Sequence, residues 1–196
     1  MIWVLVGATI AAIIFFMVRN KSVTDTLPNV RLRQQEAASL PELQKVSLAS
    51  NVRELALTGY DRGRGKAKAE GKADRFAHEV GILDALYCVL ANTNDARADP
   101  RVRVAMQMES VPFNNLEPQL GREAVAEYLV WKFFPDWADE EALSKAMREF
   151  IKVFFERVES ESDPDGAIQQ MIYSTNYDWQ TLAAREAREV PGETNG

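Results

Sequence analysis

The chain holds one histidine and one cysteine, His78 and Cys88, and these are the residue types most often found in zinc sites and among nucleophile–base pairs. A structural zinc site commonly needs four His or Cys ligands, and a di-iron site in a helical bundle needs a Glu-x-x-His motif from each of two helices. The sequence supplies neither set. We therefore expect no metal and no cofactor, and we place His78 on a helix surface or at the core edge.

A second candidate for chemistry is the segment ESDPDG, which places Glu161, Asp163 and Asp165 at alternate positions before Gly166. A calcium-binding loop has this pattern, but its twelfth position requires a bidentate carboxylate and is Ile172 here. We interpret the segment as a capped turn. Nucleophile-elbow, phosphate-loop and dinucleotide motifs are also absent from the sequence. An enzyme is thus disfavoured, although a small lyase or hydrolase using carboxylates and arginine stays open.

A basic segment, DRGRGKAKAEGKADR, covers residues 61–75 and carries a net charge of +3. Its basic residues are Arg62, Arg64, Lys66, Lys68, Lys72 and Arg75. With almost nothing to bury, it is interpreted as a mobile or partly helical solvated loop. The alternative is contact with anionic lipid headgroups or an acidic partner, where each cation gains about 1 kcal/mol. The chain as a whole has a charge of −6, which argues against nucleic-acid binding.

Aromatic residues concentrate in FFPDW and YDW, which supply Phe133, Phe134, Trp137, Tyr177 and Trp179. Such clusters fill corners between helices, or they line an exposed groove in which a partner's aromatic or apolar anchors bind. Periodicity does not separate these two interpretations.

The elements that position these residues begin with an apolar run from Met1 to Val18, which contains no charged side chain. As a helix it would reach about 27 Å, close to the roughly 30 Å hydrocarbon core of a bilayer. We expect residues 1–19 to form a single transmembrane anchor rather than a cleaved signal peptide or a buried helix. Because Arg19 and Lys21 follow the run, the N-terminus should face outside the cell membrane and the bulk of the chain the cytoplasm.

Small residues recur four apart within this span, at Gly7 and Ala11 and at Ala8 and Ala12. Such a face lets two membrane helices approach closely, so it is a candidate packing face for a partner helix. Alanine and glycine are also common in membrane helices, so a plain tether stays equally open.

After the span, residues 20–38 are expected to be a juxtamembrane linker and residues 39–189 one all-α domain of five or six helices, followed by a flexible tail, 190–196. A capping box at Ser39–Glu42 predicts a helix with an apolar stripe of Leu40, Leu43, Val46, Val52 and Leu55 that ends at Gly59. The next stripe joins Phe76, Val80, Leu83, Tyr87 and Leu90, widened by Ile82, Leu86 and Val89.

Later elements follow the same pattern of apolar positions three and four apart. Residues 100–109 alternate as a strand would, but Asp99-Pro100 favours a capped helix. The later predicted stripes are Val125, Leu129 and Phe133; Leu143, Met147, Phe150, Phe154 and Val158; and, over 164–189, Ile168, Ile172, Thr175, Trp179 and Leu182.

Together these features predict a membrane-anchored helical accessory or scaffolding protein. Its expected partners are the lipid bilayer and a protein, either a different chain or a second copy of this one, but not nucleic acid. A membrane-surface sensor that uses the basic segment is a further alternative.

Overall fold

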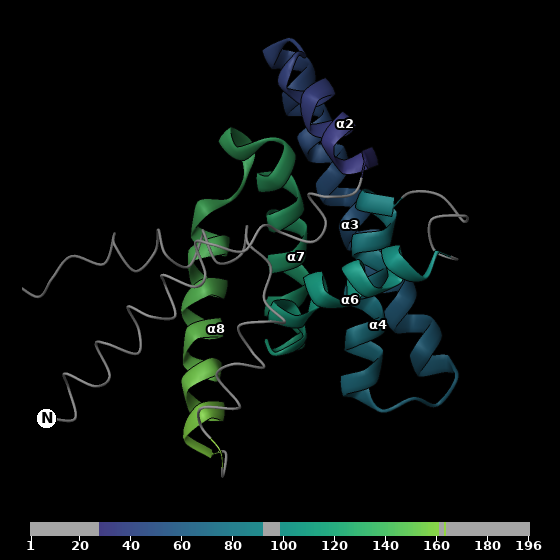
Figure 1. The fold of residues 1–196 in the computed structure, drawn as a ribbon, viewed down its shortest axis with the longest axis vertical. Helices are drawn as coiled ribbons and strands as arrows, with labels where there is room; N and C mark the ends of the chain where they lie inside the picture. The colour runs from purple at the N-terminus through teal and green to yellow at the C-terminus, as the bar shows by residue number, and fades with distance from the viewer. Residues whose placement is uncertain (1–27, 92–98, 161–162, 164–196) are drawn as a thin grey trace, which may run out of the picture.

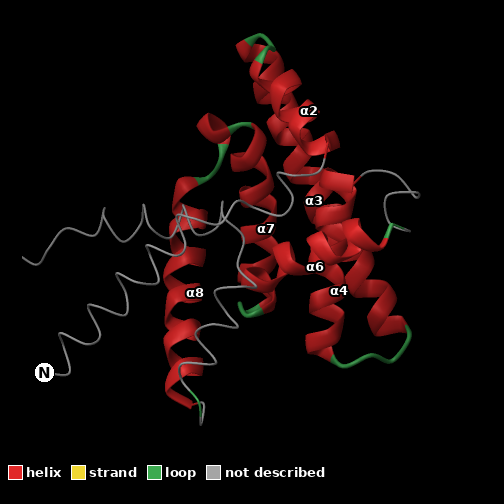
Figure 2. Ribbon diagram, in the orientation of Figure 1, coloured by secondary structure: helices red, strands yellow, loops and turns green. Residues whose placement is uncertain are grey.

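The computed structural model describes residues 28–91, 99–160 and 163, and within these ranges it is helical and contains no strand (Figures 1 and 2). The elements are α2 (Pro28–Ala38), α3 (Glu42–Ala69), α4 (Asp74–Leu86), a π-helix η2 (Tyr87–Ala91), α6 (Pro100–Asn114), α7 (Pro118–Phe133), a 3-10 turn η3 (Pro135–Trp137) and α8 (Glu140–Ser160). The predicted all-α bundle is confirmed.

Several predictions fall outside these residues. None of the described helices is long and apolar enough to span a membrane. The predicted anchor, with Gly7, Ala8, Ala11 and Ala12, lies outside the described residues, and so do the helix predicted over 164–189, with Tyr177 and Trp179, and the tail.

The longest helix, α3, packs antiparallel to α4 along its second half (Figure 1). A Cβ added to Gly59 would lie 3.1 Å from Ala85 Cα, and one added to Gly63 would lie 2.9 Å from the carbonyl oxygen of Val80. The two backbones therefore approach too closely for larger side chains. The prediction that Gly59 ends this helix is wrong, because here glycine is needed for packing and α3 continues to Ala69.

The buried face of α4 and η2 agrees with the predicted stripe in part, because Leu90 is buried in the main core and Leu83 and Tyr87 pack against it. Phe76 is 49% exposed, whereas the small residues Ala77, Gly81 and Ala85 are buried against α3. Ile82 and Leu86 are fully buried, as expected for the residues that widen the stripe. Small side chains occupy the side of α4 that faces α3, where the two backbones approach closely, and large apolar side chains occupy the side that faces the rest of the core.

The α3 stripe needs the same correction. Leu43, Val46 and Leu55 are exposed, whereas Ala49 and Ala56 are buried. Ser39 does not cap α3, because its hydroxyl donates to the carbonyl of Glu36 at the end of α2 and Pro41 occupies the cap position.

The remaining boundaries agree better with prediction. Residues 100–109 are helical, and the Asp99 carboxylate accepts a hydrogen bond from the backbone N–H of Arg101 as the predicted cap. Val125 and Leu129 of α7 and Leu143, Met147 and Phe150 of α8 are buried in the main core. The side chains of Phe154 and Val158 lie outside the description. The second half of the expected linker, residues 28–38, is the helix α2.

Candidate functional site

A groove of about 180 Å³ opens where α2 diverges from the first half of α3. Its apolar lining comes from four elements: Ala37 and Leu40 from α2 and the turn after it, Leu48 and Val52 from α3, Val89 from η2, and Phe133 with Phe134 at the end of α7. Arg33 and Glu36 of α2 supply its charged groups. The groove is thus an apolar recess with polar groups on one wall.

The wall formed by α2 is held by Arg33, whose guanidinium donates a hydrogen bond to the carbonyl of Val89. Val89 lies in η2, and a π-helix shifts the backbone hydrogen-bond pattern by one residue from that of an α-helix. Beyond this contact, Ala37 packs with Ala49, Val130 and Phe134 in a small apolar cluster. One charged contact and one cluster of apolar side chains therefore position α2 against the body.

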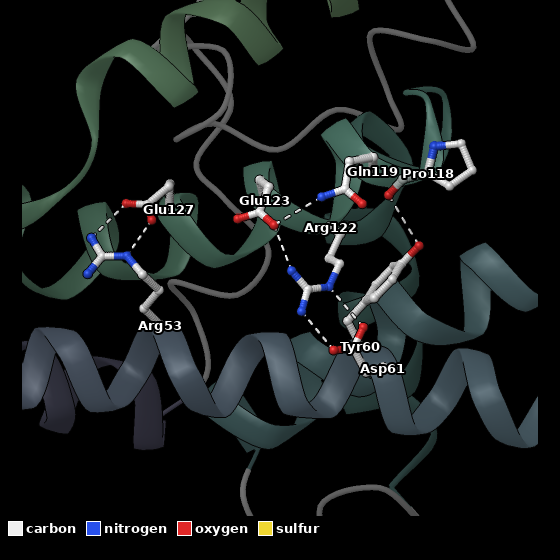
Figure 3. A network of polar contacts seen from close by, with 8 residues as sticks. All are labelled: Arg53, Tyr60, Asp61, Pro118, Gln119, Arg122, Glu123 and Glu127. Atoms are coloured by element: carbon white, nitrogen blue, oxygen red, sulfur yellow. Dashed lines mark hydrogen bonds and ion pairs between the residues drawn. The ribbon is translucent and has the colours of Figure 1, made fainter.

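Next to Val52 of the groove lining, a partly buried ion pair joins Arg53 of α3 to Glu127 of α7 (Figure 3). The guanidinium forms a fork with both carboxylate oxygens, and Nη2 lies 2.9 Å from Glu127 Oε2. The same nitrogen donates to the carbonyl of Trp137 at 2.9 Å, and Glu127 Oε2 accepts from the N–H of Asp139 at 2.8 Å. The hydrogen bond to Glu127 raises the pKa of Arg53. This brace fixes α3, α7 and the corner after α7 to one another.

Farther along the same interface, Arg122 of α7 makes a second fork with Asp61 of α3, at 2.8 and 2.7 Å (Figure 3). Arg122 also donates to Glu123 at 2.6 Å. The hydrogen bond from Arg122 lowers the pKa of Asp61. In the first fork the arginine belongs to α3 and the carboxylate to α7, and in the second fork this is reversed. The two ion pairs together fix the antiparallel register of α3 and α7.

His78 joins four helices in the interior, so its predicted position on a surface or core edge is wrong. The ring is 2% exposed, with Nδ1 2.9 Å from the hydroxyl of Tyr60 and Nε2 3.1 Å from the carbonyl oxygen of Phe113. Because a carbonyl only accepts, Nε2 carries the proton and Nδ1 accepts from Tyr60 when the ring is neutral. The hydroxyl also lies 3.2 Å from the carbonyl oxygen of Pro118. Burial lowers the pKa of His78.

A second buried polar group joins Glu109 of α6 to Tyr128 and Lys132 of α7. The Tyr128 hydroxyl donates to Glu109, and Lys132 Nζ lies 3.8 Å from the same carboxylate and 5.6 Å from the Tyr128 ring centre. The side chains of Glu109 and Lys132 are 0% and 1% exposed. None of the three lines the groove. They neutralise one another inside the bundle and connect α6 to α7.

The predicted aromatic site is brought together in part. Phe133 and Phe134 line the groove, and Trp137 is half-buried in the adjoining cluster with Ala37 and Phe134. The prediction missed the contributions of α2, α3 and η2. Leu40 and Val52 belong to the predicted stripe and carried some signal, but no pattern in the sequence shows that α2 and α3 diverge.

The six predicted basic residues lie on the second half of α3, in the turn after it and at the start of α4, away from the groove. Arg62 pairs with Asp84 at 3.2 Å and lies 3.0 Å from the Cys88 sulfur. Arg64 and Lys68 both pair with Asp74, at 3.1 and 2.8 Å, and Arg75 pairs with Glu79 at 3.6 Å. Lys66 and Lys72 are exposed. The segment is therefore mostly helical, and four of its cations are placed by carboxylates.

Among the described residues no three His, Cys, Asp or Glu side chains come together as metal ligands. Comparison of the chain with protein-family models, with curated proteins and with solved structures gives no match. What the site does must therefore be argued from its shape and chemistry.

Proposed function

We propose that this chain is a membrane-tethered helical adaptor that offers the groove between α2 and α3 to an apolar helix of a partner protein. The observation that carries the proposal is the groove itself, an apolar recess built from four separate elements.

The size of the groove favours side chains of a protein over a small molecule. Pockets for drug-sized ligands and cofactors measure roughly 300–1,000 Å³, whereas this recess measures about 180 Å³. It has room for one or two large apolar side chains. An amphipathic helix supplies such side chains three or four positions apart, and a few anchors of this kind provide most of the binding energy of a helix in a groove.

Exposed apolar residues also lie on the first half of α3, on the face directed away from the groove. Leu43 is 89% exposed and Val46 is 45% exposed, and both lie on the first half of α3 near the turn that joins it to α2. Leaving such side chains in water has a cost that a bound partner removes, at about 25 cal/mol per Å² of apolar area. At about 100° per residue, Leu43 and Val46 lie about 120–180° around α3 from Leu48 and Val52, so they form a surface separate from the groove.

The tether in the proposal comes from the apolar run 1–18 and the cations after it. A single anchor in the cell membrane, with the N-terminus outside, holds the domain at the cytoplasmic face. Tethering confines the domain and a membrane partner to one surface, which raises their effective concentration without any new contact. A groove of modest size is then sufficient for a stable complex.

The groove is tested by paired substitutions on α3. Leu48→Glu places a carboxylate in the apolar lining, whereas Leu55→Glu makes the same change at a position that is 43% exposed and outside the groove. In native membranes, a photoreactive side chain at position 40 should give a discrete protein adduct. Leu48→Glu should abolish the adduct and Leu55→Glu should retain it. Equal yields in both variants would contradict the groove, and an adduct at twice the mass of the chain would identify a second copy as the partner.

The tether is tested separately by topology. A cysteine at the extreme N-terminus should react with an impermeant thiol reagent in intact cells or spheroplasts, and a cysteine in the 190s should not. Gly7→Leu with Ala11→Leu should stay in the membrane fraction. Loss of the partner adduct in that variant would show that the anchor also packs on a partner helix, and an unchanged adduct would show that it is only a tether.

A further inference from the structure

We infer that the end of the α3–α4 hairpin rests on the anionic lipid headgroups of the membrane that holds the anchor; this inference rests on the proposed tether. We call this end of the hairpin the basic tip and define it as residues 64–76.

The basic tip is cationic on an acidic chain. It contains Arg64, Lys66, Lys68, Lys72 and Arg75 against the acids Glu70 and Asp74, so its net charge is 5 − 2 = +3, whereas the whole chain carries −6. Asp74 is shared between Arg64 and Lys68. Lys66 and Lys72 are exposed and form no ion pair with any residue that the structure describes. Clusters of this size near a membrane segment attract anionic lipids.

An aromatic side chain accompanies these cations. Phe76 is 49% exposed in the first turn of α4. Side chains on a helix lean toward its N-terminus, so the ring leans toward the hairpin end and not toward the core. Cations combined with an exposed aromatic residue are typical of surfaces that lie at the level of the lipid headgroups.

The path of α2 directs its own N-terminal end toward the same end of the molecule. Arg33 contacts Val89, whose neighbour Cys88 packs against Gly59 in the second half of α3. Four residues later, Ala37 packs with Ala49 in the first half of α3. The helix α2 therefore runs antiparallel to α3, so that its N-terminal end is directed toward the basic tip, while the turn between α2 and α3 lies at the opposite end of α3 (Figures 1 and 2).

The connecting chain is long enough for the geometry. Residues 20–27 join the predicted anchor to α2, and eight extended residues span up to about 26 Å. From the level of Gly59 to the end of α3 at Ala69 is ten residues, or about 15 Å of helix. The basic tip can therefore touch the bilayer surface while the anchor spans it. Contact of the tip with the bilayer then holds the domain in a fixed orientation, and a partner reaches the groove from the side of the domain.

The experiment uses the full chain in vesicles, with Cys88→Ser removing the native thiol. A fluorophore is attached at Ala69→Cys, exposed at the basic tip, or at Ser47→Cys, exposed on the first half of α3. Nitroxide-headgroup lipids act as the quencher. The vesicles are phosphatidylcholine alone or phosphatidylcholine mixed with phosphatidylserine. We expect several-fold stronger quenching at position 69 than at position 47 in the mixed vesicles. This difference should be lost in neutral vesicles and in about 1 M salt, where the screening length falls to about 3 Å.

A charge-reversal pair provides the matched control. Lys66→Glu with Lys72→Glu should reduce quenching at position 69 to the level at position 47. Lys145→Glu with Lys152→Glu makes the same change in net charge on α8 and should leave it unaltered. Equal quenching at both label positions, or quenching at 69 that ignores phosphatidylserine, would overturn the inference. Flotation after alkaline carbonate reports the tether independently: a chain that leaves the membrane contradicts the anchor, and one that stays without selective quenching contradicts only this contact.

Discussion

Along the second half of α3, Gly59 and Gly63 allow the backbone of α4 to approach directly, whereas along the first half Leu48 and Val52 face an open groove. We call the second half of α3 the closed half, because its small residues let α4 pack directly on it. We call the first half the open half, because its large apolar residues line the groove. The closed half buries Ala56, Tyr60 and Ala67, and the open half leaves Leu43 89% exposed.

The size of the side chains along α3 thus separates a half that stabilises the bundle by packing on α4 from a half that is available to a partner. Small residues give a short interhelical distance and many backbone contacts, which makes the α3–α4 pair a rigid support. Leu48 and Val52 are partly buried against neighbouring helices and line the groove with their remaining area, whose burial by a partner would be favourable. The closed half should consequently tolerate no added volume at Gly59 and Gly63, and the open half should tolerate changes at its exposed positions in the isolated chain.

The largest expected effect contrasts two leucines. Leu86 of α4 is 0% exposed in the main core, so Leu86→Ala should lower the free energy of unfolding by about 2–5 kcal/mol through lost burial and a cavity. Leu43→Ala in the open half should change it by less than about 0.5 kcal/mol. Chemical denaturation followed by circular dichroism measures both. Similar losses for the two variants would mean that the first half of α3 is covered in solution.

A smaller effect is expected from two glycines of the same helix. A Cβ on Gly63 would lie 2.8 Å from Asp84 Cβ and 2.9 Å from a backbone oxygen, so Gly63→Ala should cost about 1–3 kcal/mol by overpacking. At Gly65 nothing lies within 4 Å, and Gly65→Ala should stabilise α3 by up to about 1 kcal/mol through helix propensity. If Gly63→Ala also raised the free energy of unfolding in the same denaturation assay, the expected difference between positions 63 and 65 would be contradicted.

Local patterns predicted the fold class and several elements well. The Asp99-Pro100 pair identified the start of α6, and the stripes around Leu129 and Met147 identified the buried faces of α7 and α8. These features depend on residues close in the sequence, where capping and helical periodicity act directly. Phe133 and Phe134 were likewise found as candidates for a groove because they are adjacent aromatics.

The side on which α3 and α4 meet could not be predicted from the periodicity of large apolar residues, because the close approach places alanine and glycine at the interface and leaves Phe76 exposed. A glycine at position 59 indicated the end of a helix, but in the structure Gly59 lies at a packing contact between α3 and α4. The ion pair between Arg53 and Glu127 joins residues that are far apart in sequence, and neither residue carries a local signal. Such contacts exist only once the topology is known.

The smallest expected effect is a pH dependence confined to the closed half. His78 is the only histidine in the chain, and the ring contacts Tyr60 of α3 and the carbonyl of Phe113 of α6. Burial lowers the pKa of His78, and Arg64 acts in the same direction, whereas the backbone hydrogen bond to Phe113 and the charges of Glu79 and Asp74 oppose the shift. The folded chain therefore binds this proton less readily than the unfolded chain does.

The sign of the effect follows from that difference in pKa. Above about pH 6.5, the ordinary histidine pKa, the ring is neutral in both the folded and the unfolded state. Protonation of His78 therefore does not reduce the free energy of unfolding there. As the pH falls below about 6.5 toward the lower folded pKa, the unfolded state takes up the proton first, and the free energy of unfolding declines by at most about 1.4 kcal/mol per pH unit. Urea unfolding between about pH 7.5 and 5 should show this slope. His78→Gln keeps a side-chain N–H for the Phe113 carbonyl but does not titrate, so its slope should be flatter whatever its absolute stability. Because Asp61, whose pKa is lowered, titrates below this range, an equal slope in both proteins would show that water reaches the closed half and that His78 is not held in the interior.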